Sequence, residues 1–216
     1  MANASGWLEV ARRAKGFMPP EEGDALYRAA CDAGPGTFVE IGTYCAKSAI
    51  YVGAAARQVG SVLFTIDHHR GSEEMQPGWL HHDPEVVDPV AGTMDSLPFA
   101  RLHLSQAGLE DHVVLVVGRS DQVARHWPGP VQFLFVDGGH GAEVAAADFA
   151  AWVPKVPEGG VLAVHDVFED PDLGGQVPFE LYRACVEPSG PGAPRFVEVG
   201  RCGSLRVARR CAEPAF

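Results

Sequence analysis

The stretch FVEIGTYCAKSAIYVG, residues 38–53, decides the expected fold. The stretch begins within an apolar run, Thr37–Ile41. This run is continuous rather than alternating, as in strands buried on both faces of a sheet. Gly42 follows at once, and Cys45–Gln58 is predicted to form a helix. Such a strand–turn–helix unit is typical of a doubly wound α/β sheet, in which ligands bind at the carboxyl ends of the strands.

Four further apolar runs of this kind follow at wide spacing. They are Val62–Ile66, Val113–Val117, Val131–Val136 and Val161–Val164. Further helices are predicted between the runs, at Thr93–Ala107 and Ala142–Trp152. Because strands and helices alternate, the five runs are expected to pair as parallel strands.

The pattern changes after the fifth run. A helix is predicted near Pro178–Val186, and the segments Arg195–Val199 and Leu205–Ala208 flank a glycine-containing turn, as in a β-hairpin. The expected fold class is therefore α/β. We predict a Rossmann-like, doubly wound, seven-stranded sheet that is mostly parallel, with an antiparallel C-terminal hairpin and helices on both faces.

The length of 216 residues is typical of a single α/β domain, so residues 1–216 are expected to form one unit. Residues 1–34 are predicted to hold two N-terminal helices, one over 7–15 and one from Met18 to Ala33. Residues 69–92 form a polar segment with proline, glycine and histidine that is too long for a simple loop. This segment is predicted to be a lid or an insertion.

The chain is acidic, with 17 Lys+Arg against 28 Asp+Glu and a formal net charge of −11. An acidic chain without a basic cluster is a poor nucleic-acid binder, because neutralising phosphates supplies most of that affinity. No apolar run approaches the ~20 residues of a membrane span, and the N-terminus lacks the order of a signal peptide. Five cysteines without a CxxC pair indicate reduced thiols. We expect a cytoplasmic protein with a small-molecule partner, no nucleic acid and no membrane.

Polar residues stand at the end of every predicted parallel strand. The five groups are Glu40–Tyr44, Asp67–His69, Gly118–Asp121, Asp137–His140 and His165–Asp166. Helix capping would explain any one group alone. All five at one edge of the sheet indicate a ligand site.

The first strand end favours a nucleoside without a pyrophosphate. A dinucleotide site needs the spacing G-x-G-x-x-G, whereas Gly42 has no second glycine within the next five residues. Asp67, 25 positions after Gly42, is placed to bind ribose hydroxyls. S-adenosylmethionine (SAM) fits these features better than NAD, and acidic walls suit its sulfonium charge.

The same stretch resembles the first motif of the class I methyltransferases, in particular catechol O-methyltransferase and its bacterial relatives. LFTID, AGLEDHVVLVVGRS, PVQFLFVDGGH and GGVLAVHDV resemble the later motifs, and GFMPPEEGDALYRAA is similar to an entrance helix of bacterial sugar and macrolide O-methyltransferases. The resemblance covers residues from about 15 to 168. Two departures are Ala46, where a second glycine is usual, and the added segment 69–92.

The resemblance implies SAM as cofactor and assigns its contacts by position. Gly42 and Tyr44 would contact the methionine part, with Glu40 and Ser48 beside it. Asp67 would bind the ribose and His68 would lie near the adenine. Ser120 and Asp121 would flank the adenine at the third strand end.

A divalent metal is implied by the same resemblance, with Asp137, His165 and Asp166 as ligands. A bound ion would lower the pKa of an acceptor hydroxyl and fix its oxygen in line with the methyl group. Mg²⁺ is the expected ion, but it prefers oxygen ligands. Either the site also accepts Mn²⁺ or a similar ion, or His165 faces away and water takes its place.

His140 lies where the catechol enzyme carries its basic lysine, so His140 is predicted to be the general base beside the catalytic Asp137. The alternative is that His140 caps the following helix. The pairs His68–His69 and His81–His82 permit a zinc site, but no close cysteine pair supports it, and contacts to a lid or to the substrate are the preferred interpretation.

The predicted activity is SAM-dependent methyl transfer to a hydroxyl of a sugar or saccharide. The small bacterial enzymes that methylate saccharides, such as those of methylmannose polysaccharide synthesis, are the nearest group by size and lid. A phenol or catechol acceptor is the alternative within the class, and a non-methyltransferase Rossmann-like module with a histidine-bound metal is the alternative outside it. Dimers are common in the family, which adds a homodimer to the expected partners.

Overall fold

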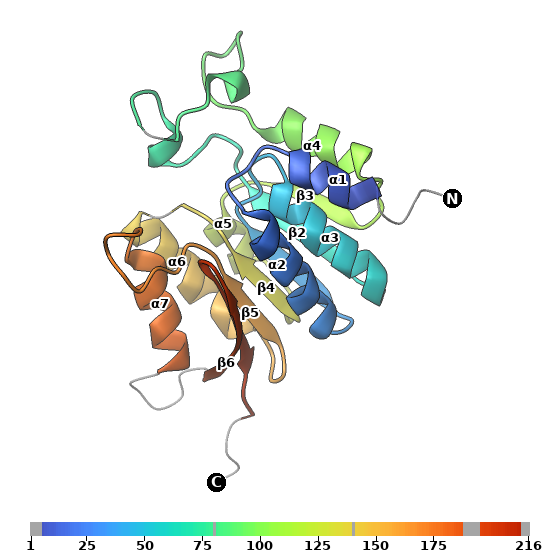
Figure 1. The fold of residues 1–216 in the computed structure, drawn as a ribbon, viewed down its shortest axis with the longest axis vertical. Helices are drawn as coiled ribbons and strands as arrows, with labels where there is room; N and C mark the ends of the chain where they lie inside the picture. The colour runs from blue at the N-terminus through green and yellow to red at the C-terminus, as the bar shows by residue number, and fades with distance from the viewer. Residues whose placement is uncertain (1–5, 80, 140, 188–194, 213–216) are drawn as a thin grey trace.

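The computed structural model describes residues 6–79, 81–139, 141–187 and 195–212. Within these residues the chain forms a seven-stranded sheet in the order β3-β2-β1-β4-β5-β7-β6 (Figure 1). The strands are β1 Thr37–Ile41, β2 Val62–Asp67, β3 Val113–Val117, β4 Phe133–Val136, β5 Val161–Val164, β6 Phe196–Cys202 and β7 Leu205–Arg210. The predicted sheet is confirmed.

The first five strands are parallel, and β7 pairs antiparallel with both β5 and β6. β4 and β5 are buried at every position, which explains why their sequences are continuously apolar. The strand order reverses between β1 and β4, because the chain first builds outward to β3 and then returns. A ligand crevice is expected at this switch point.

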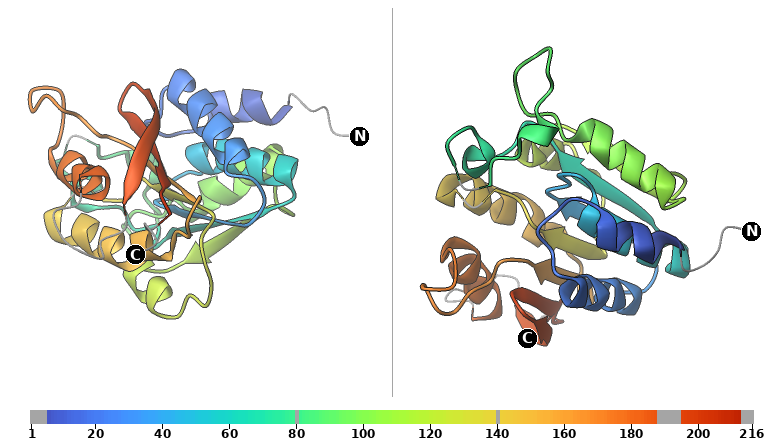
Figure 2. Two further views of the ribbon diagram at one scale, coloured as in Figure 1. Left: turned by 90° about the horizontal axis from the view of Figure 1, so that it is seen from below. Right: turned by 45° about the horizontal axis from the view of Figure 1, so that its top comes forward.

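Helices cover both faces of the sheet (Figure 2). One hydrophobic cluster takes residues from α1 Gly6–Arg13, α2 Pro20–Asp32, α3 Lys47–Val59 and α4 Leu97–Gln106. The other takes residues from α5 Ser120–Arg125, α6 Ala142–Trp152 and α7 Val177–Val186. In the described part of the chain, none of these helices has the length and apolar composition that a membrane span requires.

Three helices begin later than their sequences predict. α2 begins at Pro20 rather than Met18, because Pro19 is its N-cap in an extended conformation. α3 begins at Lys47 rather than Cys45 because Tyr44 and Ala46 have φ angles of 46° and 70°, outside the helical range. α4 begins at Leu97 because Met94 pairs with Val87 in an isolated antiparallel bridge.

The segment 69–92 extends away from the layers of the sheet, at the top of Figure 1. It contains two short 3-10 helices, Glu73–Met75 and Pro84–Val86, joined by turns. Val86 packs with Met94 against Cys45, which lies two residues before the start of α3. The segment is thus tied to the first strand–helix connection.

Gly23 on α2 lies against the buried ring of Tyr51 on α3, and a Cβ at Gly23 would collide with ring atoms. We expect Gly23→Ala to lower the free energy of unfolding by about 1 kcal/mol, because overpacking costs ~1–3 kcal/mol and outweighs the gain in helix propensity. Urea unfolding measures the change. The control is Gly6→Ala, whose Cβ would meet nothing within 4 Å. Equal stability of the two variants would contradict the tight packing of α2 on α3.

Candidate active site

Gly42 lies where the end of β1 contacts the end of β4. Its φ is 94°, and a Cβ there would collide with the carbonyl oxygen of Asp137. The Asp137 amide in turn donates to the carbonyl of Ile41, at 2.9 Å. The glycine is therefore required by the approach of two strand ends, and this places the cofactor motif beside the predicted metal ligands.

Asp67, at the end of β2, orders the loop that follows β1. Its Oδ2 accepts the backbone N–H groups of Thr43 and Tyr44, at 3.1 and 2.8 Å, and its Oδ1 accepts the N–H of His69, at 2.7 Å. Two carboxylate oxygens offer about four acceptor positions, so little capacity remains for a ribose. Within the protein, Asp67 holds the loop that carries Tyr44 in its positive-φ conformation.

Glu40 is fully buried in β1, below this loop. Its Oε2 accepts the hydroxyl of Thr65 at 2.5 Å, and that hydroxyl lies 2.5 Å from the hydroxyl of Thr43. Burial raises the pKa of Glu40 to about 8, although hydrogen bonds from Ser48 and Thr65 act to lower it. Ser48 is itself buried in the first turn of α3. The raised pKa favours a neutral carboxyl at this position, beneath the loop of residues 42–46, which we call the cofactor loop after its predicted role.

The residues predicted to surround the adenine lie at the ends of β2 and β3. His68 is exposed, and its Nδ1 accepts the N–H of Arg70 at 3.0 Å. The hydroxyl of Ser120 is bonded to the buried carboxylate of Asp148 on α6. Asp121 pairs with two arginines, with N–O distances of 3.1 Å to Arg119 and 2.6 Å to Arg125. Ser120 is therefore held in place by a residue of α6, whereas the charge of Asp121 is neutralised by arginines at the surface.

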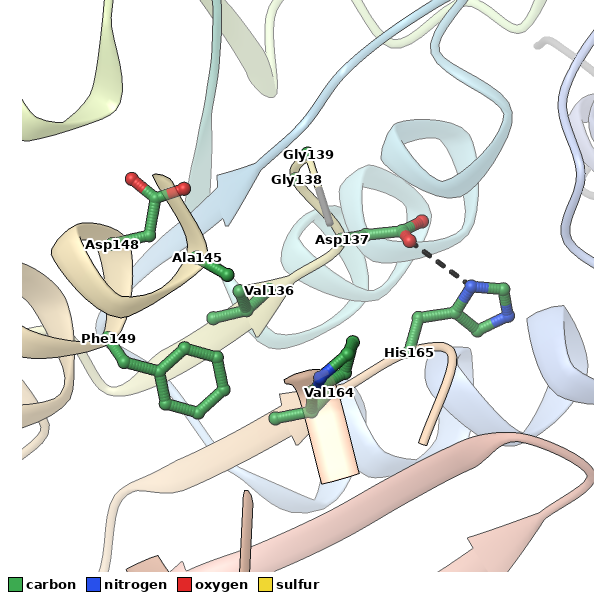
Figure 3. A pocket seen from close by; sticks show the side chains of 10 residues that line it. Val136, Asp137, Gly138, Gly139, Ala145, Asp148, Phe149, Val164 and His165 are labelled. Carbon is green, nitrogen blue, oxygen red and sulfur yellow. Dashed lines mark hydrogen bonds and ion pairs between the residues drawn. The ribbon is translucent and has the colours of Figure 1, made fainter. Parts of the chain in front are cut away.

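Asp137, His165 and Asp166 meet at the ends of β4 and β5. One ligand atom from each lies within 4.8 Å of the others. His165 Nδ1 is 3.1 Å from Asp137 Oδ1 and 3.4 Å from Asp166 Oδ2, and Figure 3 shows the ring of His165 turned toward Asp137. Asp166 has a φ of 55°, a strained conformation for a residue other than glycine. Among the described residues this is the only group of three such side chains that could hold a metal ion.

A pocket lies beside this cluster (Figure 3). Its lining residues are Val136, Asp137, Gly138, Gly139, Ala145, Asp148, Phe149, Val164, His165 and Pro178. Gly138 and Gly139 leave one wall without side chains. His140, the predicted base or helix cap, lies outside the described residues.

Glu22 on α2 completes the surroundings of His165, and it is not among the site residues predicted from the sequence. Its Oε2 is 2.5 Å from His165 Nε2, and its Oε1 accepts the backbone N–H of Ser204 at 2.6 Å. Burial alone would lower the pKa of His165, but Asp137, Asp166 and Glu22 outweigh it and raise that pKa. Burial acts to raise the pKa of Glu22, but the hydrogen bonds from His165 and Ser204 lower it.

A signal for Glu22 is present in the sequence. It lies four residues before Leu26 and eight before Ala30, on the face of α2 that is buried against the sheet. A carboxylate on an apolar helical face needs a partner inside the protein. Glu21 and Glu22 also lie in the first turn of α2, where acidic residues are favoured by the helix dipole, and this simpler interpretation hides the signal.

The segment 69–92 is held over the cofactor loop by Lys15, just after α1. Lys15 Nζ is 2.5 Å from both Asp83 Oδ2 and Glu85 Oε2. Phe17 stacks on Tyr44, with centroids 5.7 Å apart, and packs edge-on against His81. The contacts thus join the N-terminal segment, the cofactor loop and the proposed lid.

The paired histidines do not form a zinc site in the described part of the chain. His69 Nδ1 lies 2.8 Å from the hydroxyl of Ser96, and His82 Nδ1 lies 3.1 Å from the carbonyl of Met75. Each of these two histidines makes a contact within the protein, and a role in binding the substrate stays a prediction.

The raised pKa of Glu40 predicts a pH-dependent stability difference. The folded protein binds a proton here between about pH 4.5 and 8 that the unfolded chain has released, so this group makes stability fall as pH rises through that range. Glu40→Gln removes the effect. We expect the melting temperature of E40Q, relative to the wild type, to increase from pH 5 to pH 8.5. A difference that is constant with pH would show that Glu40 is ionised throughout.

Several solved structures share the fold of this chain. The SAM-bound O-methyltransferase TomG from Streptomyces achromogenes, described as involved in tomaymycin synthesis, has 18% identity and a TM-score of 0.64, over 98% of this chain and 91% of its own. The S-adenosylhomocysteine (SAH)-bound methyltransferase PaMTH1 from Podospora anserina has 15% identity and a TM-score of 0.67, over 98% and 89%. An SAH-bound O-methyltransferase from Bacillus cereus has 17% identity and a TM-score of 0.62, over 95% and 90%. The shared feature is the fold.

A family model described as a methyltransferase domain matches residues 39–167, from β1 to just beyond β5. This match spans more than half of the chain and includes the cofactor loop, Asp67 and the Asp137–His165–Asp166 cluster. It excludes the alternative of a Rossmann-like module outside the methyltransferases. The chain belongs to the methyltransferase-domain family.

Proposed function

We propose that the protein is a SAM-dependent, metal-dependent O-methyltransferase. The observation that carries the proposal is the Asp137–His165–Asp166 cluster, which adjoins the Gly42 loop at the switch point of the sheet. A cofactor bound on the loop and an acceptor bound at the cluster would meet in the same crevice.

The loop and the neighbouring strand ends would bind the cofactor. The backbone at Gly42 and the ring of Tyr44 would contact the methionine part, with Glu40 and Ser48 beneath it. The remaining acceptor capacity of Asp67 would receive a ribose hydroxyl. His68, Ser120 and Asp121 would surround the adenine. Support comes from their common position at one edge of the sheet.

The spacing within the cluster fits an octahedral ion. Adjacent ligands at about 2.1 Å from an ion lie ~3 Å from each other. His165 Nδ1 lies at 3.1 Å and 3.4 Å from the oxygens of Asp137 and Asp166. This favours His165 facing the site rather than away from it. Two oxygens and one nitrogen suit Mn²⁺ as well as Mg²⁺. When bound, the ion would supply Lewis-acid activation of the acceptor hydroxyl.

Within this proposal, His140 takes the proton of the acceptor hydroxyl as the methyl group is transferred. It is three residues after Asp137 and directly follows Gly138 and Gly139 in the sequence. A histidine with an ordinary pKa near 6.5 is suited to this role at neutral pH.

We propose a sugar or saccharide hydroxyl as the acceptor, with a phenol as the alternative. Gly138 and Gly139 line the pocket without side chains of their own, and Phe17 and Trp79 expose 57% and 53% of their surface. Aromatic faces of this kind bind apolar sugar faces and planar rings alike. We also propose that residues 1–216 act as one domain with 69–92 as lid, that the protein is cytoplasmic, and that it forms a homodimer.

The first experiment measures SAH release from SAM with a panel of saccharides and phenols, and binding of SAM against NAD by calorimetry. SAM binding with turnover on a hydroxyl acceptor is the expected result. Failure to bind SAM would refute the proposal. Turnover on phenols alone would refute the saccharide assignment and leave O-methyl transfer standing.

Asp137→Asn keeps the shape of the side chain and removes its charge. We expect methyl transfer to fall about 100-fold or more, because the acceptor oxygen is no longer held in line. Affinity for SAH is expected to persist. The matched control is Glu143→Gln, which makes the same change at an exposed position in the first turn of α6. Full activity of D137N would exclude a metal-assisted reaction at this cluster.

A further inference from the structure

We propose that Glu22 is the positioning residue of the Asp137–His165–Asp166 cluster: it binds Nε2 of His165 and so presents Nδ1 to a divalent ion. The proposal rests on the metal-dependent function proposed above. It adds a residue from α2, which lies outside the matched residues 39–167.

The ring of His165 has two nitrogens that face different groups. Nε2 lies 2.5 Å from Glu22 Oε2, and Nδ1 lies 3.1 Å from Asp137 Oδ1. A carboxylate only accepts, so the Nε2–H donates to Glu22. Nδ1 faces the carboxylates of Asp137 and Asp166 and would give up any proton that it carries there when it binds an ion. A flipped ring would turn a carbon atom toward Asp137 and lose the contacts of both nitrogens. The bond to Glu22 therefore selects the orientation in which His165 can bind an ion.

Glu22 is itself fixed by the turn between β6 and β7. Its Oε1 accepts the N–H of Ser204 at 2.6 Å, and a Cβ on Gly203 would collide with this oxygen. The side chains of Glu22 and His165 are only 6% and 4% exposed. Because the carboxylate has a partner on each oxygen and little room to move, it can hold the imidazole in one place.

A carboxylate on the second nitrogen is a common feature of histidine metal ligands. It fixes the tautomer and orientation of the ring and strengthens the ligating nitrogen. Here the three carboxylates belong to different elements, α2, the end of β4 and the end of β5. Helix α2 therefore takes part in the site through His165 without contacting the ion.

The test compares Mn²⁺ affinity, measured by calorimetry or EPR without acceptor, in the wild type, Glu22→Gln and Glu21→Gln. E21Q is the matched control, since Glu21 is the exposed neighbour on the same helix. E22Q is expected to bind Mn²⁺ about 10–100-fold more weakly, with E21Q equal to the wild type. Equal affinity in E22Q and the wild type would overturn the positioning role.

Pulsed EPR of bound Mn²⁺ gives a readout that general destabilisation does not imitate. The wild type is expected to show nitrogen coupling from a coordinated imidazole, and E22Q at saturating Mn²⁺ is expected to lose or weaken it. Unchanged coupling in E22Q would contradict the proposal. If E22Q does not fold, Glu22→Asp, which keeps the charge but shortens the reach, is measured in the same way.

Different results would refute the metal-dependent function and the positioning role of Glu22. A wild-type protein that binds SAH but no Mn²⁺ would refute the metal-dependent function and this inference with it. A wild type that binds Mn²⁺, with E22Q equal to it, would refute the inference alone. SAH affinity measured without metal is expected to be the same in E22Q and the wild type, which verifies the fold of the variant.

Discussion

The approach of β1 to β4 is the constraint on which the rest of the site depends. These strands are neighbours in the sheet although two strands separate them in the chain. Gly42 lies directly against the Asp137 carbonyl, where no side chain fits. This contact brings the loop that would bind SAM next to the cluster that would bind an acceptor. The separation of the two ligands is thereby set by backbone packing rather than by flexible side chains.

Carboxylates of similar chemistry serve different purposes around this contact. Glu40 is buried with a raised pKa, Asp67 is occupied by backbone N–H groups, and Asp137 faces His165. The differences follow from environment: desolvation for Glu40, backbone donors for Asp67 and a histidine for Asp137. The excess of acidic residues in the chain therefore includes carboxylates that stabilise the fold, and only some of the carboxylates are available to bind ligands.

Much of the fold could be predicted from the sequence because the apolar runs are continuous and widely spaced. The five parallel strands and the hairpin carry this signal clearly. The start of α3 was less predictable, since Tyr44, in the positive-φ loop before it, is held by the carboxylate of Asp67, which is distant in sequence. Helix propensity depends on residues that are close in sequence, so it does not reflect a contact of this kind.

The cluster of Asp137, His165 and Asp166 was predictable because parallel strands end at one edge of the sheet. Glu22 was missed because its partners, His165 and Ser204, are brought to it only by tertiary packing. Ser120 was predicted as an adenine contact, but its bond to Asp148 on α6 was also missed for this reason. Contacts between side chains of different layers can be found only from the structure. The alignment of parallel strand ends, by contrast, can be predicted from the order of the strands and helices in the sequence.

Anomalous diffraction from crystals grown with SAH and Mn²⁺ tests the proposed metal site most directly. We expect a single strong Mn²⁺ peak bounded by carboxylate oxygens of Asp137 and Asp166 and by Nδ1 of His165, with SAH on the Gly42 loop. SAH on that loop with no Mn²⁺ peak at the cluster, or with the ion bound elsewhere, would contradict it.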